Sequence, residues 1–95
     1  MFFGVARLEL HIPAAHSLKD KRRVIGHLRT RAAERAGMSF AEVEHNDLWQ
    51  RAAVGVTKVY RDAAGEADFR GALDKLSIGE DYLVADATVR FERFP

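Results

Sequence analysis

Hydrophobic and polar positions alternate with a period of two near the start of the chain. Between residues 2 and 12 the even-numbered positions are apolar or glycine, whereas the odd-numbered positions mix apolar and charged side chains. A period of two with one mixed face predicts a strand that is covered on one side only. Pro13 should end this strand, because proline has no N–H group to donate to a neighbouring strand.

Three further stretches predict strands. Residues 82–94 alternate again, and five of them are expected to face inward: Leu83, Ala85, Ala87, Val89 and Phe91. Residues 38–45 and 50–60 are also strand-like, but their apolar parity is not clean, which indicates a bulge or a paired open face. The residues at 45–48 favour a turn, so these two strands should form a hairpin.

Two stretches have the spacing of amphipathic helices. The first begins after Ser17 as N-cap, with Asp20 three residues later, and ends at Gly37. Its apolar stripe consists of Val24, Ile25, Leu28, Ala32 and Ala36. The second, at 62–79, is shorter and more acidic, and its stripe consists of Phe69, Ala72, Leu73 and Leu76.

The resulting order, β-α-β-β-α-β, predicts one ferredoxin-like α+β domain over residues 1–95, with two helices on one face of a four-stranded antiparallel sheet. The other face of the sheet then has no helix over it. The first and last strands would place Phe3, Val5, Tyr82 and Val84 on that face. Apolar residues there predict a homodimer, formed through the open face or an edge strand.

Composition removes several classes of function. The chain has no cysteine, which excludes disulfides, thiolate metal sites and cysteine nucleophiles. Its first ten residues are too short for a membrane span and lack the features of a signal peptide, so we expect a cytoplasmic protein with no membrane association. Charge is uneven: residues 1–40 carry eight Lys/Arg against three Asp/Glu, and residues 41–95 carry seven against eleven. Such asymmetry is typical of a surface that faces a polyanion.

Two runs resemble a known family. Residues 8–24 read LELHIPAAHSLKDKRRV and residues 41–51 read AEVEHNDLWQR. They are similar to the two signatures of the YlxP-like family, which are small bacterial proteins of unknown function. The resemblance covers nearly the whole chain and implies a ferredoxin-like fold without assigned catalytic residues. Members are often encoded near translation-initiation and ribosome-maturation factors, an association that points to RNA. The chain departs from the pattern at Gly26, Gly65 and Gly71, where better helix formers are expected.

The start of the first helix is the main candidate site. Candidate anion-binding residues are His16, Lys19, Arg22, Arg23 and Arg29. A helix N-terminus attracts phosphate, whereas cations in the first turn oppose the dipole at about 0.3–1 kcal/mol each, so their presence favours a ligand. We therefore predict a non-enzymatic module that binds RNA or the ribosome through the phosphate backbone. The aromatic motif of sheet-face RNA readers is absent, so binding should be salt-sensitive with little sequence specificity. The alternative is a solvated helix face.

Four further residues are candidates for an interface or for stacking: Trp49, Arg51, Phe3 and Tyr82. Trp49 is either a stacking or interface residue, or a partly buried residue that closes the end of the sheet. Arg51 could pair with Glu9 or Asp86 across the open face. The four histidines do not have the spacing of metal ligands, so we expect neither a metal site nor another cofactor.

Two other functions stay open. The loop at 13–17 could bind a phosphometabolite or support a small enzyme, since acylphosphatases use this fold, but their glycine-rich cradle is missing and no catalytic residue is assigned. A pocket lined by His11, His16 and Arg22 would favour that function. Alternatively, the protein is a homodimeric structural or interaction protein with no nucleic-acid role. Helix cations that are each paired with a carboxylate would favour this last function.

Overall fold

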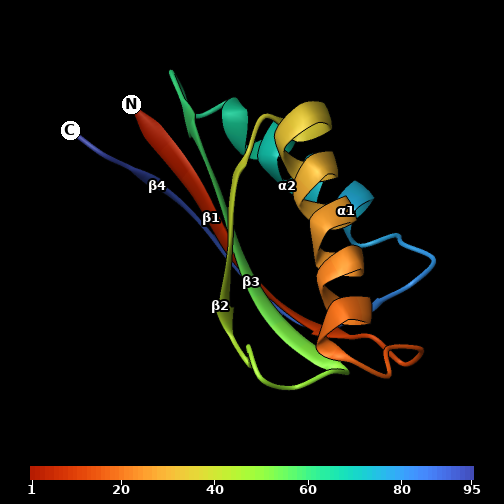
Figure 1. The fold of residues 1–95 in the computed structure, drawn as a ribbon. Coiled ribbons are helices and arrows are strands. Elements are labelled where there is room, and N and C mark those ends of the chain that lie inside the picture. The colour runs from red at the N-terminus through yellow and green to blue at the C-terminus, as the bar shows by residue number, and fades with distance from the viewer.

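The elements follow the predicted order. The computed structural model describes residues 1–95 and contains β1 (Phe2–His11), α1 (Leu18–Ala36), β2 (Ser39–Glu44), β3 (Arg51–Tyr60), α2 (Gly65–Leu76) and β4 (Leu83–Arg93). All strand pairs are antiparallel, and the sheet order is β2-β3-β1-β4. Both helices cover one face of the sheet, and the other face is left without a helix (Figure 1). The ferredoxin-like prediction is confirmed.

The bounds of α1 follow from its capping residues. The Ser17 hydroxyl accepts a hydrogen bond from the Asp20 N–H, and the Asp20 carboxylate accepts one from the His16 N–H, both at 3.0 Å. The first of these bonds satisfies one of the N–H groups that the first turn leaves without a helical partner, and the second fixes the residue before the cap. The helix ends at Gly37, whose φ of 64° lies in the left-handed region that glycine adopts at little cost. Neither helix combines the length and the apolar composition needed to cross a bilayer.

The core lies between the sheet and the helices. The even-numbered residues of β1 point into it, as the period of two predicts. Ala52, Val54 and Val56 of β3 join them, and this layer packs against the apolar stripes of both helices. Phe69 of this core is completely buried and lies directly over Gly4. A Cβ atom on Gly4 would lie 2.5 Å from the Phe69 ring, so only glycine fits beneath this side chain.

The start of β4 differs from the prediction because the strand contains a bulge. Glu9 pairs with Asp86 but the next residue of β1 pairs with Val84, so Ala85 has no partner. The alternation is as predicted from Asp86 onward and is inverted before it. Leu83 and Ala85 were therefore predicted wrongly to face inward: Leu83 is 60% exposed and lies opposite His11 on the open face.

Two residues that were expected on the open face lie on the helix side. Val84 packs against the core. Tyr82 is 6% exposed, and its hydroxyl donates a hydrogen bond to the Leu76 carbonyl, which ties the 77–82 connection to the end of α2. The prediction of Tyr82 as an interface residue is therefore wrong, and Phe3 and Val5 stay on the open face.

Candidate functional site

Three segments meet at one end of the molecule: the β1–α1 connection, the first turns of α1 and the β2–β3 hairpin loop (Figure 1). The sequence placed the candidate cations in the first two segments and Trp49 in the third. It gave no reason for these segments to be joined. A buried lysine and a glutamine join them.

Lys21 is the buried lysine. Its side chain is 2% exposed, and its Nζ atom donates hydrogen bonds to the carbonyls of His45, at 2.5 Å, and Leu48, at 2.8 Å. The carboxylate of Glu42 on β2 lies 2.8 Å from the same atom. An ammonium group is costly to bury unless it is paired and hydrogen-bonded, and here it is both. Lys21 thus connects the first turn of α1 to both ends of the hairpin turn.

The candidate site predicted from the sequence does not include Lys21. A signal was available, because Lys21 precedes Val24, Ile25 and Leu28 by three, four and seven residues. That spacing places it on the buried stripe of α1. A charged residue on an apolar stripe indicates a partner that the fold supplies.

Gln50 makes the second connection. Its side-chain amide donates to the carbonyls of Pro13, at 3.1 Å, and Ala15, at 3.2 Å. The backbone carbonyl of Gln50 accepts a hydrogen bond of 2.9 Å from the Ile12 N–H. The hairpin turn is closed as predicted, by a bond from the Leu48 N–H to the His45 carbonyl. The loop is therefore fixed on both sides, at α1 and at the β1–α1 connection.

The fixed loop presents apolar side chains outward. Trp49 is 53% exposed, and Leu48 beside it is also exposed. The interpretation of Trp49 as a partly buried residue closing the sheet end is therefore wrong. Trp49 borders a cavity of about 430 Å³ together with His11, Arg51 and two neighbouring loop residues, and His16 and Arg22 do not line it. The predicted grouping of His11, His16 and Arg22 around one pocket is not what the structure shows.

The candidate cations of α1 lie on the side of the helix opposite its apolar stripe, and the Arg29 guanidinium lies over the Phe40 ring of β2, 5.4 Å from its centroid. Lys19, Arg22, Arg23 and Arg29 are all exposed, and we call these four residues the cationic stripe. None of the ion pairs of the protein includes any of them, so no carboxylate lies within 4.0 Å of their charged groups. Gly26 lies within the stripe, and a Cβ atom there would meet nothing within 4 Å.

The helix N-terminus carries a negative charge of its own. Among the N–H groups of the first turn, that of Asp20 is capped by Ser17, and the Asp20 carboxylate lies in the same turn, where it disfavours a bound anion. The same carboxylate accepts the His16 backbone N–H, and the His16 ring lies at the surface without a hydrogen bond to the protein. The side chains of the cationic stripe are therefore better placed to bind an anion than the helix N-terminus.

A charged network covers part of the open sheet face. Arg7 on β1 reaches across β3 to Glu44 on β2, at 2.5 Å, and also pairs with Glu9, at 2.6 Å. These hydrogen bonds hold the pKa of both carboxyl groups below the ordinary value. His45 lies 3.3 Å from Glu9, and Arg51 lies 3.4 Å from His45. Arg51 therefore contacts His45, and its predicted pairing with Glu9 or Asp86 is not observed.

The network includes the one group of residues with the composition of a metal site. The ligand atoms of Glu9, Glu44 and His45 lie within 4.8 Å of one another. The guanidinium of Arg7 pairs with both carboxylates of this group. A divalent cation would have to displace it, so the arrangement is that of an ion-pair network linking three strands.

Comparisons with known proteins place the chain in a family without assigning it an activity. The profile of DUF503, described as "Protein of unknown function (DUF503)", matches residues 3–86. The chain is also 38% identical over 56 residues to a Bacillus subtilis (strain 168) protein named "Uncharacterized protein YlxP". That match covers 59% of this chain and 61% of the relative, so the aligned part spans less than two thirds of the relative's length.

Proposed function

We propose that this chain, which belongs to the DUF503 family of unknown function, binds single-stranded RNA at the end of the molecule described above. In this proposal the phosphates contact the cationic stripe of α1, and a base stacks on Trp49. The proposal rests on one observation: the four cations of the stripe are exposed and have no carboxylate within 4.0 Å. A helix face that only solubilised the protein would have no need to leave all four unpaired.

The spacing of the stripe suits a nucleic-acid backbone. Arg22 and Arg23 follow Lys19 by three and four positions, and Arg29 follows Arg22 by seven. The four charges are therefore spread along one side of the helix rather than surrounding one point. Each phosphate contact with single-stranded RNA lowers the slope of log K against log salt by about 0.7. If all four cations bind phosphates, the slope should be about −3.

Trp49 adds the contact that favours unpaired bases. A base stacked on an aromatic side chain is worth about 1–3 kcal/mol, and any base can stack. Trp49 is half exposed, and the Lys21 and Gln50 hydrogen bonds hold its loop against α1, so little order has to be gained on binding. Stacking of this kind selects single strands over duplexes without selecting a sequence.

Gly26 allows a test that leaves the fold intact. A side chain at this position meets open space and replaces a poor helix former, so Gly26→Glu and Gly26→Gln should both fold. Binding of a fluorescently labelled single-stranded RNA is measured by anisotropy over a series of salt concentrations. We expect Gly26→Glu, which puts a carboxylate inside the stripe, to weaken binding about tenfold or more at low salt. Gly26→Gln serves as the uncharged control and should bind like the wild type.

Trp49 is tested in the same assay. Trp49→Ala should weaken binding about fivefold or more, and Trp49→Phe should keep most of the affinity because it retains a stacking surface. The proposal fails if the wild type does not bind RNA at low salt. It also fails if Gly26→Glu binds as tightly as Gly26→Gln.

A further inference from the structure

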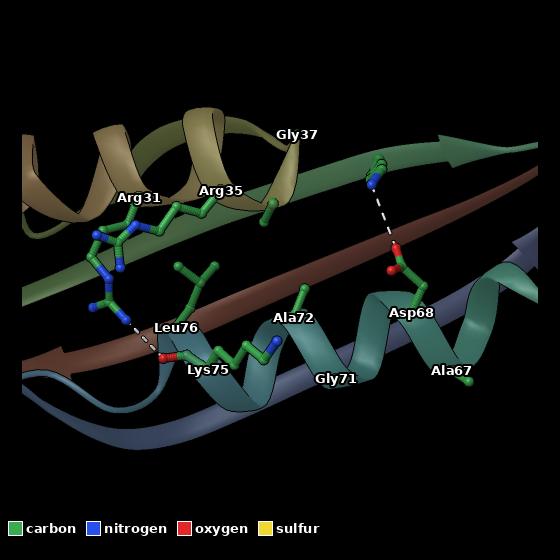
Figure 2. A pocket seen from close by; sticks show the side chains of 11 residues that line it. Arg31, Arg35, Gly37, Ala67, Asp68, Gly71, Ala72, Lys75 and Leu76 are labelled. Atoms are coloured by element: carbon green, nitrogen blue, oxygen red, sulfur yellow. Dashed lines mark hydrogen bonds and ion pairs between the residues drawn. The ribbon is translucent and has the colours of Figure 1, made fainter.

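A second basic region lies on another side of α1. The C-terminal half of α1 runs beside α2, and a groove of about 460 Å³ lies between them (Figure 2). Arg31 and Arg35 line it from α1, Lys75 and Asp68 from α2, and Lys58 from β3. The groove stays open because small residues, including Gly71, lie along it, and a Cβ atom on Gly71 would meet nothing within 4 Å.

The single carboxylate of the groove is already engaged. Asp68 accepts a hydrogen bond of 2.7 Å from the Tyr60 hydroxyl and lies 3.5 Å from Lys58. The Tyr60 hydrogen bond and the charge of Lys58 hold the pKa of Asp68 below its ordinary value. Asp68 therefore stays ionised at neutral pH and compensates Lys58. The other three cations of the groove have no carboxylate within 4.0 Å.

Arg31 is held in place without losing its charge. Its guanidinium donates to the Tyr82 hydroxyl, at 2.6 Å, and to the Lys75 carbonyl, at 2.8 Å, and both acceptors are neutral. These bonds orient the guanidinium at the wall of the groove and leave further donors unused. Helix C-termini attract cations, which can account for Arg35 and Lys75, but Arg31 lies before the last turn of α1.

We propose that this groove binds a small organic polyanion that carries two phosphate groups. Its volume is within the range of about 300–1,000 Å³ that is typical of small-molecule sites. Three uncompensated cations on two facing walls suit more than one anionic group, and arginine suits phosphate because its planar fork can donate two hydrogen bonds at once. The groove faces α2, whereas the cationic stripe lies on the side of α1 opposite its apolar stripe, so this site is separate from the proposed RNA surface.

Inorganic pyrophosphate is the probe, with orthophosphate for comparison, and binding is measured by calorimetry at low salt. Pyrophosphate should bind about tenfold more tightly than orthophosphate, because it can contact both walls. Gly71→Glu puts a carboxylate in the groove and should weaken pyrophosphate binding about tenfold or more, whereas Gly71→Gln should weaken it much less. Gly26→Glu is the matched control, since it makes the same change outside the groove, at a helical glycine whose added Cβ atom also meets nothing within 4 Å.

The two surfaces should respond in opposite ways. Gly26→Glu is expected to lower RNA affinity and to leave pyrophosphate affinity within about twofold, and Gly71→Glu is expected to do the reverse. Absence of pyrophosphate binding by the wild type overturns the proposal, whatever the RNA result. So does equal weakening by Gly71→Glu and Gly26→Glu, which would indicate a general charge effect. Loss of RNA binding in Gly71→Glu would make the groove part of the RNA surface and would also overturn it.

Discussion

The buried Lys21 ammonium contacts two carbonyls of the hairpin loop and the carboxylate of Glu42 on β2. Its removal should leave two carbonyls and the Glu42 carboxylate without their partner in a buried place. We expect Lys21→Met to lower the free energy of unfolding by about 3–5 kcal/mol, the range found when one member of a buried ion pair is removed. Urea unfolding measures this effect. Lys19→Met removes an exposed cation two residues earlier and should change the stability by less than about 0.5 kcal/mol.

Trp49 reports on the same loop, because it is the only tryptophan of the chain. If Lys21 holds the loop, Lys21→Met should lower the fluorescence anisotropy of Trp49 under conditions where the protein is still folded. An unchanged stability and anisotropy in Lys21→Met would show that Gln50 and the β2–β3 ladder fix the loop without the lysine.

At the residue scale, the sequence identified the exposed cations of the cationic stripe but not the surroundings of single large side chains. Lys19, Arg22, Arg23 and Arg29 could be placed because helical spacing puts them opposite the apolar stripe. Trp49 and Tyr82 could not be placed, because each depends on contacts between segments distant in the sequence. Tyr82 is buried by its hydrogen bonds with Arg31 and the end of α2. Trp49 is exposed because Lys21 and Gln50 take up the inner side of its loop.

At the scale of elements, the bounds of a helix or strand could be predicted where they are determined by residues close together in the sequence. The start and end of α1 were predicted closely, because Ser17, Asp20 and Gly37 act within one turn of the helix. The parity of β4 was predicted only from Asp86 onward, since a bulge adds one residue without a turn signal. A bulge in β2, where Glu42 pairs with Val54 and Glu44 with Ala53, agrees with the irregular parity seen there.

The ion pairs of Arg7 with Glu9 and Glu44 should make the stability of the protein depend on pH. Glu9 and Glu44 have lowered pKa values in the folded protein because Arg7 donates hydrogen bonds to them. Carboxyl groups of this kind add stability above the unfolded pKa, and that stability is lost as the pH falls through the folded pKa. The free energy of unfolding should therefore decrease as the pH is lowered below 4.5, the ordinary value of a glutamate.

Denaturant unfolding at neutral pH and at a series of acidic pH values measures this dependence. Arg7→Met keeps an apolar stem over the sheet but removes the hydrogen bonds, so the loss of stability on acidification should be smaller than in the wild type. Arg90→Met is the control, because it removes a cation from the same sheet face while leaving Glu9 and Glu44 paired. Equal acid sensitivity in Arg7→Met and the wild type would contradict the assignment.

At the scale of the whole molecule, the two faces of the sheet are covered to different extents. The helices bury one face, and on the other face the charged network covers the half nearer the hairpin loop. The remaining half carries Phe3 and Val5 on β1 and Val59 on β3, and both valines are exposed. Val59 pairs directly with Phe3, so these side chains form one apolar surface. The exposed Val43 of β2 lies over Gly55, whose partner in β1 is Arg7, and therefore borders the charged network. Two of the residues that first suggested a homodimer, Tyr82 and Val84, are not on the apolar surface.

We expect this surface to join two copies of the chain, because a second copy presents the same apolar residues and covers both sets at once. Val59 is 63% exposed, so Val59→Glu should not disturb the fold but would place a charge in the interface. Sedimentation velocity over a range of concentrations should show a dimer for the wild type and a monomer for Val59→Glu. Ile78→Glu replaces a 77% exposed residue away from the sheet and should leave the dimer intact. A wild type that sediments as a monomer at every concentration would show that the open face does not join two copies of the chain. Function would then have to be sought at the hairpin end and in the interhelical groove.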